Sequence, residues 1–187
     1  AACTPVSYHR DGVTIRAEDG SKTAVNFASP SLVHVRAVPA GENFSRRKSL
    51  SVLPQKPFTD WSRERQGDSL LRLTTSALRL EIDLRDGHIV FRDAQGRLLN
   101  AENERSFTPY SAGGQQAYSV LQTFRPDPEE SFYGLGQHQA DEWDYCDRDE
   151  ELYQYNTKIS VPFVVSSKGY GLLWDSYSLC RWGDPRE

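Results

Sequence analysis

Two stretches of the chain decide its fold: FYGLGQ at Phe132–Gln137 and QYNTKISVPFVVSSKGYGLLW at Gln154–Trp174. The second holds the densest run of β-branched and aromatic residues, Ile159–Val165, and such residues are typical of strands. We expect this strand to end at Ser166–Gly169, because serine and glycine favour turns, and to pair with a strand that starts at Tyr170. The stretch therefore predicts a β-hairpin.

Glycine and proline mark irregular points in these strands. Gly134 and Gly136 stand on either side of Leu135. A glycine in a strand predicts a positive φ angle or the close approach of another segment. Pro162 lies inside the expected strand and has no backbone N–H, so it predicts a sheet edge or a bulge.

The rest of the chain also predicts short strands. The clearest pattern is Leu78–Leu84, where leucine and isoleucine alternate with charged residues, as in a strand with one buried face. Further strands are expected at Val6–Ala17 (a hairpin around Asp11-Gly12), Ala24–Phe27, Leu32–Val38, Ser49–Leu53, His88–Phe91, Leu98–Leu99 and Ala117–Phe124. No window has a sustained apolar period of 3.6 residues, so we expect no helix longer than two turns. The predicted fold is all-β: a two-sheet antiparallel sandwich over residues 1–187, incomplete at its C-terminus.

Composition excludes several classes of function. Apolar residues make up 37% of the chain, charged residues 26%, and the net charge is −4. An acidic chain lacks the basic surface that a phosphate backbone requires, so we expect no nucleic-acid partner. Apolar runs stay far below the ~20 residues that span a bilayer, so we expect no transmembrane segment. A chain of this size buries roughly 70% of its unfolded surface, so it needs no metal to fold.

The N-terminus and the cysteines bear on localisation. Ala1-Ala2-Cys3 resembles the end of a bacterial lipoprotein signal, and the chain contains no methionine. We therefore expect an exported protein, periplasmic or extracellular; lipid attachment at Cys3 and a trimmed secretory signal or cut end are the two interpretations left open for its N-terminus. The wide spacing of Cys3, Cys146 and Cys180 indicates no zinc or redox motif. A Cys146–Cys180 disulfide is left open.

The stretch from Phe132 onward resembles glycoside hydrolase family 31, the retaining α-glycosidases. The matching pieces are FYGLGQ (Phe132–Gln137), QYN (Gln154–Asn156) and VPFVVSSKGYGLLWDSYS (Val161–Ser178). Thr75–Asp93 and Ser29–Pro39 resemble the N-terminal sandwich of the same family. GLGQH followed by NTKISVPF is most similar to the α-xylosidase-like branch.

The resemblance implies a galactose-mutarotase-like β-sandwich that precedes a (β/α)8 barrel with two catalytic aspartates. Residues 1–187 contain no alternating βα units and no segment like the nucleophile strand of that barrel. We therefore expect a non-catalytic N-terminal domain with no catalytic residue, cofactor or metal of its own. Its partners would be the barrel of the same polypeptide and an oligosaccharide substrate. The alternative is a free-standing carbohydrate-binding module.

The family places a hairpin loop of this sandwich at the mouth of the barrel. The equivalent residues here are Tyr155, Asn156, Thr157 and Lys158. Their amide, hydroxyl and ammonium groups can hydrogen-bond sugar hydroxyls and hold the substrate without doing chemistry. An ordinary polar strand entry is the alternative interpretation.

A second candidate is the acidic loop His138–Tyr153. Aromatic rings can pack on a pyranose while polar groups bind its hydroxyls, so we name a sugar rim of Gln137, Trp143, Asp144 and Tyr145. A solvated loop is the alternative. Asp141 and Asp144 are a poor glycosidase pair, because an exposed, like-charged loop offers little burial to raise a pKa. The mutarotase-like fold also raises anomer exchange, with His34, His88 and His138 as candidates, but the resemblance to hydrolases argues against it.

Overall fold

The computed structural model describes residues 6–139 and 142–183, and all regular elements in these ranges are β-strands. The expectation of an all-β chain without long helices is confirmed over the described residues. These residues form two compact units, which we describe separately. The first unit contains residues 6–48 and 53–125, and the second contains residues 49–52 and 126–183.

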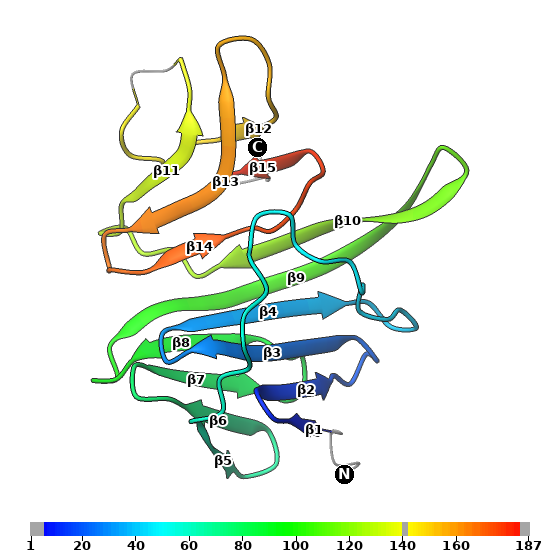
Figure 1. Cartoon of the computed structure of the whole chain (residues 1–187), viewed down its shortest axis with the longest axis vertical. Helices are drawn as coiled ribbons and strands as arrows, with labels where there is room; N and C mark the ends of the chain where they lie inside the picture. The colour runs from blue at the N-terminus through cyan, green and yellow to red at the C-terminus, as the bar shows by residue number, and fades with distance from the viewer. Residues whose placement is uncertain (1–5, 140–141, 184–187) are drawn as a thin grey trace. The chain divides into compact units, whose positions relative to one another are not determined.

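The first unit is an antiparallel sandwich of two sheets (Figure 1). One sheet has the order β1-β2-β3-β4, with β1 at Val6–His9, β2 at Gly12–Arg16, β3 at Lys22–Ser29 and β4 at Leu32–Val38. The other has the order β10-β9-β8-β7-β6-β5. Its strands are β5 (Ser62–Gln66), β6 (Leu70–Thr74), β7 (Leu78–Asp83), β8 (Ile89–Asp93), β9 (Leu98–Ala112) and β10 (Gln115–Phe124).

Alternating apolar residues of both sheets form one core between them. The four-stranded sheet contributes Val13, Ile15, Val25 and Phe27, and the six-stranded sheet with its turns contributes Leu71, Leu73, Leu80, Ile82, Leu84 and Ile89. The predicted alternation in β7 is confirmed, because Leu80 and Ile82 are buried while Glu81 lies on the other face. There Glu81 pairs with Arg72 of β6 at 3.2 Å and with Arg92 of β8 at 3.1 Å.

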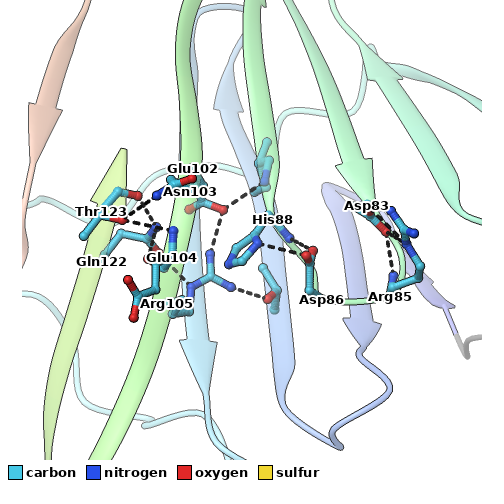
Figure 2. Close-up of polar contacts among 12 residues, drawn as sticks. Asp83, Arg85, Asp86, His88, Glu102, Asn103, Glu104, Arg105, Gln122 and Thr123 are labelled. Atoms are coloured by element: carbon cyan, nitrogen blue, oxygen red, sulfur yellow. Dashed lines mark hydrogen bonds and ion pairs between the residues drawn. The ribbon is translucent and has the colours of Figure 1, made fainter. Parts of the chain in front are cut away.

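A β-bulge in β9 brings two opposite charges to the same side of the strand. Phe124 pairs with Glu102 and Thr123 with Glu104, so Asn103 is the extra residue. The extra residue reverses the alternation of faces, so Glu102 and Arg105 point toward one another (Figure 2). The Arg105 guanidinium donates to Glu102 at 2.7 Å and also reaches Thr23 of β3, in the opposite sheet, at 2.9 Å. Arg105 therefore links the two layers through its hydrogen bond to Thr23.

Two expectations about the first 125 residues need correction. Ser49–Leu53 was expected to be a strand, but it is irregular, because Ser49 Oγ accepts the amides of Ser51 and Val52 in a local turn. The strand expected at Leu98–Leu99 is the start of the 15-residue strand β9, which continues to Ala112. The hairpin turns at Gly113-Gly114, both with positive φ, and runs past the neighbouring strands (Figure 1).

The second unit contains a three-stranded and a two-stranded sheet. The first has the order β11-β13-β14, with β11 at Phe132–Gln137, β13 at Ile159–Ser166 and β14 at Gly171–Leu173. The second pairs β12 (Glu150–Leu152) with β15 (Cys180–Trp182). Leu135, Tyr145 and Val164 form a small core, which Phe132, Leu152, Leu172 and Trp182 border.

The predicted irregularities of these strands are confirmed. Gly134 and Gly136 have φ angles of 128° and 102°, and a Cβ on Gly136 would lie 2.1 Å from the Ile159 carbonyl oxygen. The register of β11 and β13 shifts between these glycines, opposite the part of β13 that contains Pro162. The predicted hairpin β13–β14 is also present.

Three further findings concern features that the sequence raised. Cys146 and Cys180 are both free and half-buried. Within residues 6–139 and 142–183 there is no helix long and apolar enough to cross a membrane, and no cluster of three His, Cys, Asp or Glu side chains suited to a metal ion. Cys3 and Asp141 lie outside the described residues.

Candidate functional site

The predicted loop Tyr155–Lys158 is a tight turn between β12 and β13. Tyr155 and Lys158 form an isolated antiparallel bridge, and the Lys158 amide donates to the Tyr155 carbonyl oxygen at 3.1 Å. Asn156 and Thr157 are the two central residues, and both are exposed. Thr157 has a φ of 74°, which matches the second central position of a type II turn. The structure thus presents an amide and a hydroxyl at the tip of a short hairpin.

Thr157 is strained in this conformation. A β-branched residue with positive φ is a genuine outlier, because its Cβ crowds the following carbonyl, at a cost of about 1–2 kcal/mol. Its hydroxyl donates to the Asn156 carbonyl oxygen at 2.5 Å, which offsets part of this cost. Strained backbones of this kind cluster at binding sites, where the surrounding structure holds them in place.

Lys158 does not face solvent with its loop neighbours. Its residue is 8% exposed, and its ammonium donates to the Glu150 carboxylate and, at 2.6 Å, to the Glu151 carbonyl oxygen. Burial alone would lower the pKa of Lys158, but the hydrogen bond and the charge of Glu150 outweigh it, so the pKa is raised. The side chain stays charged and attaches the loop to β12.

His138 lies beside this ion pair. Its Nε2 donates to the Leu135 carbonyl oxygen at 2.8 Å, and its Nδ1 lies 3.2 Å from the same Glu150 oxygen that Lys158 binds. The Nδ1 atom has no hydrogen-bond partner among the described residues, so its contact with Glu150 is close but is not a hydrogen bond. The side chain is 3% exposed, so it lies away from solvent.

The predicted rim residues divide into two groups. Gln137 and Trp143 are exposed, and Trp143 reaches 86%. Asp144 instead accepts the amides of Phe132 and Cys146, each at 2.9 Å. A hydrogen bond from Ser131 and these amides lower its pKa, so it stays ionised. Tyr145 is buried in the small core. Of the four predicted rim residues, Gln137 and Trp143 are therefore available to a ligand. Asp144 and Tyr145 instead stabilise the second unit.

Tyr153 is a site residue that the sequence reasoning did not select. Its ring lies 5.3 Å from the ring of Tyr155, and the two residues are 48% and 51% exposed. The Lys158 ammonium lies 5.8 Å from the centroid of each ring. Residues two apart in an extended segment share one face, so the Tyr153-Gln154-Tyr155 spacing was the signal that could have found the pair.

The fold places the chain among the two-layer β-sandwich domains, and comparison with known proteins identifies its family. Residues 22–182 match the family model of the glycosyl hydrolase 31 N-terminal galactose mutarotase-like domain. This match covers most of the sequence, so the chain belongs to that family. The predicted family resemblance is confirmed.

Similar proteins are longer than this chain. An α-xylosidase from Saccharolobus solfataricus is 35% identical over 140 residues, which cover 70% of this chain and 19% of that protein. The crystal structure of a family 31 α-xylosidase from Xanthomonas citri is 36% identical, with a TM-score of 0.90, and the match covers 97% of this chain and 20% of that one. An α-xylosidase from a soil metagenome, at 24% identity and a TM-score of 0.81, shares the fold. The chain therefore spans about one fifth of the length of the first two relatives.

Proposed function

We propose that this chain is the non-catalytic N-terminal domain of a retaining α-glycosidase of the α-xylosidase or α-glucosidase type. In this proposal residues 1–187 pack on a catalytic (β/α)8 barrel of the same polypeptide. They lend the Tyr155–Lys158 loop to the mouth of the substrate site. The observation that carries the proposal is the match over 97% of this chain to one fifth of an α-xylosidase.

The loop would act by binding and orientation. The Asn156 amide and the Thr157 hydroxyl stand at the tip of a strained turn, where both can hydrogen-bond sugar hydroxyls. Lys158 would hold the turn from beneath through Glu150, because its ammonium is already bound within the chain. A preformed turn does not have to be ordered when substrate binds, so its hydrogen bonds contribute more fully to affinity.

The test uses the full-length enzyme with alanine at the tip of the loop. Replacing Asn156 or Thr157 with alanine should lower kcat/KM about tenfold, since one lost hydrogen bond of ~1.4 kcal/mol corresponds to a factor of ten. Thr157→Ser keeps the hydroxyl and should retain most of the activity. Thr108→Ala, at an exposed position of β9, is the matched control. Unchanged kinetics in both loop variants would remove this loop from the substrate site.

A free-standing carbohydrate-binding module is the second candidate. The 86% exposure of Trp143 favours it, because such modules bind sugars through exposed aromatic rings. Titration of the 187-residue chain with xylose- and glucose-containing oligosaccharides separates the two functions. Saturable binding that Trp143→Ala abolishes would favour the module. An absence of binding, together with activity of the full-length enzyme, would favour the accessory domain.

Export to the periplasm or the outside of the cell, with lipid attachment at Cys3, is also part of the proposal. Its support is the Ala1-Ala2-Cys3 sequence alone. Expression of the complete gene with labelled palmitate tests it. Label should enter the protein, and Cys3→Ser should prevent this. A full-length product that stays unlabelled in the cytoplasm would refute both parts.

A further inference from the structure

Two tyrosine rings stand side by side next to the loop. Tyr153 and Tyr155 have ring centroids 5.3 Å apart and planes inclined by 36°, and about half of each residue is exposed. Isolated exposed tyrosines are common on protein surfaces, whereas two adjacent half-exposed rings form a continuous apolar area with hydroxyls at its edge. Such an area suits a ligand with both an apolar face and polar edges.

The chain holds this pair in place from below. The buried Lys158 ammonium lies 5.8 Å from both ring centroids, where a cation is attracted to the faces of the rings. The ammonium is fixed in turn by Glu150. Behind Tyr153, its carbonyl oxygen accepts the hydroxyl of Ser160 in β13 at 3.0 Å. The rings are therefore attached to β12 and β13 at several points, so little ordering is left for binding to complete.

We propose that Tyr153 and Tyr155 form a stacking surface for a glucosyl or xylosyl ring of the substrate, other than the ring whose bond is cleaved. These pyranoses carry their hydroxyls at the equator, which leaves an apolar face of C–H groups for an aromatic ring. Asn156 and Thr157 adjoin the rings in sequence and can bind the equatorial hydroxyls. This inference rests on the proposed function, and it adds a site for a second sugar unit.

The experiment compares long and short substrates in the full-length enzyme. Tyr153→Ala and Tyr155→Ala should each raise KM for an oligosaccharide of four or more units about threefold to tenfold, the range of one aromatic contact. For Tyr153→Ala, which lies outside the Tyr155–Lys158 loop, activity on a nitrophenyl α-glycoside, which has no further sugar unit, should not change. Tyr153→Phe and Tyr155→Phe keep the rings and should behave as the unaltered enzyme. Tyr110→Ala, a half-exposed tyrosine of β9, is the matched control.

The results that would contradict the stacking surface differ from the result that would contradict the proposed glycosidase function. Equal losses on both substrates would overturn it, because they would indicate that the rings support the catalytic part of the enzyme. Unchanged KM for the oligosaccharide in both alanine variants would overturn it as well. An unaltered full-length enzyme that cleaves no α-glycoside would instead contradict the proposed function itself. The phenylalanine variants retain packing, so a loss in them as large as in the alanine variants would also refute stacking.

Discussion

Replacing Arg105 with methionine should destabilise the first unit strongly. The guanidinium makes three contacts inside the sandwich: to Glu102 at 2.7 Å, to Gln122 at 2.8 Å and to Thr23 at 2.9 Å (Figure 2). The Arg105 and Glu102 side chains are 8% and 5% exposed, so water cannot replace a lost partner. Methionine fills similar space but leaves Glu102 with the Ile89 amide as its remaining donor.

The loss of stability in Arg105→Met can be estimated in two ways. Breaking a buried ion pair by removing one partner costs about 3–5 kcal/mol. Counting bonds gives a figure at least as large, since each of the three bonds from the charged guanidinium contributes about 1.5–3 kcal/mol. We therefore expect Arg105→Met to lower the free energy of unfolding at pH 7 by about 4 kcal/mol. A double variant that adds Glu102→Gln should recover about half of this loss, because no buried charge then remains.

The pH dependence gives a sharper test. Burial raises the pKa of Glu102 even with Arg105 present, and removing the guanidinium takes away the charge that opposes this effect. A carboxyl group whose pKa is higher in the folded state than in the unfolded state binds more protons when the protein is folded. Such a group lowers the free energy of unfolding at pH values above its folded-state pKa, and it has no such effect at pH values below its unfolded-state pKa. The deficit of Arg105→Met relative to the unaltered chain should therefore shrink as the pH falls from 7 toward 5. Each pH unit of that window changes it by at most about 1.4 kcal/mol.

The assay must report on the first unit alone. Urea unfolding followed by hydrogen exchange of peptides from β3, β8 and β9 does so, since these strands carry the contacts of the ion pair. Arg97→Met is the matched control, because Arg97 makes a 2.6 Å ion pair with Asp93 but its side chain is 76% exposed. If both substitutions change stability equally, or if the deficit is the same at pH 5 and pH 7, the argument from the buried charge is wrong.

Three further predictions concern the second unit. Glu130→Ala should lower the free energy of unfolding of this unit by about 3–5 kcal/mol. The buried Glu130 carboxylate accepts hydrogen bonds from Ser166 at 2.5 Å and Tyr170 at 2.6 Å, and it pairs with Lys168 at 2.9 Å. Unaltered hydrogen exchange of the β13 amides would contradict this prediction. Lys158→Met should cost about 1–3 kcal/mol and speed exchange of the loop amides, whereas a stable, rigid loop would show that the anchor is dispensable. Leu135→Ala should cost about 3 kcal/mol through the cavity it leaves in the small core, measured by urea unfolding against Leu173→Ala at an exposed position; equal losses would refute it.

The local sequence pattern was sufficient to predict strands in which apolar residues are buried and polar residues are exposed. β7 could be predicted because its leucines alternate with charges, and β13 because its β-branched run ends in a serine and glycine turn. The part of β9 beyond Leu98–Leu99 was missed because its outer half, with residues such as Glu104 and Pro109, pairs with β10 alone and buries little. Pro109 is tolerated there because β8 does not reach that part of the strand. The Gly113-Gly114 turn was the signal for this hairpin, and the polar strands around it concealed it.

The family resemblance indicated the loop Tyr155–Lys158, but the sequence did not indicate the roles of its residues. Sequence gives Lys158 a charge, but whether that charge meets a sugar or Glu150 depends on where β12 lies, and the eight-residue separation does not fix this. The same contact explains why Thr157 keeps its positive φ angle. The ion pair of Lys158 with Glu150 and the backbone bridge between Lys158 and Tyr155 leave the turn little freedom to relax. Loosening Lys158 should therefore affect the tip at Thr157 more than β13. Substrate binding, which requires a fixed tip, should therefore weaken before the stability of the second unit changes.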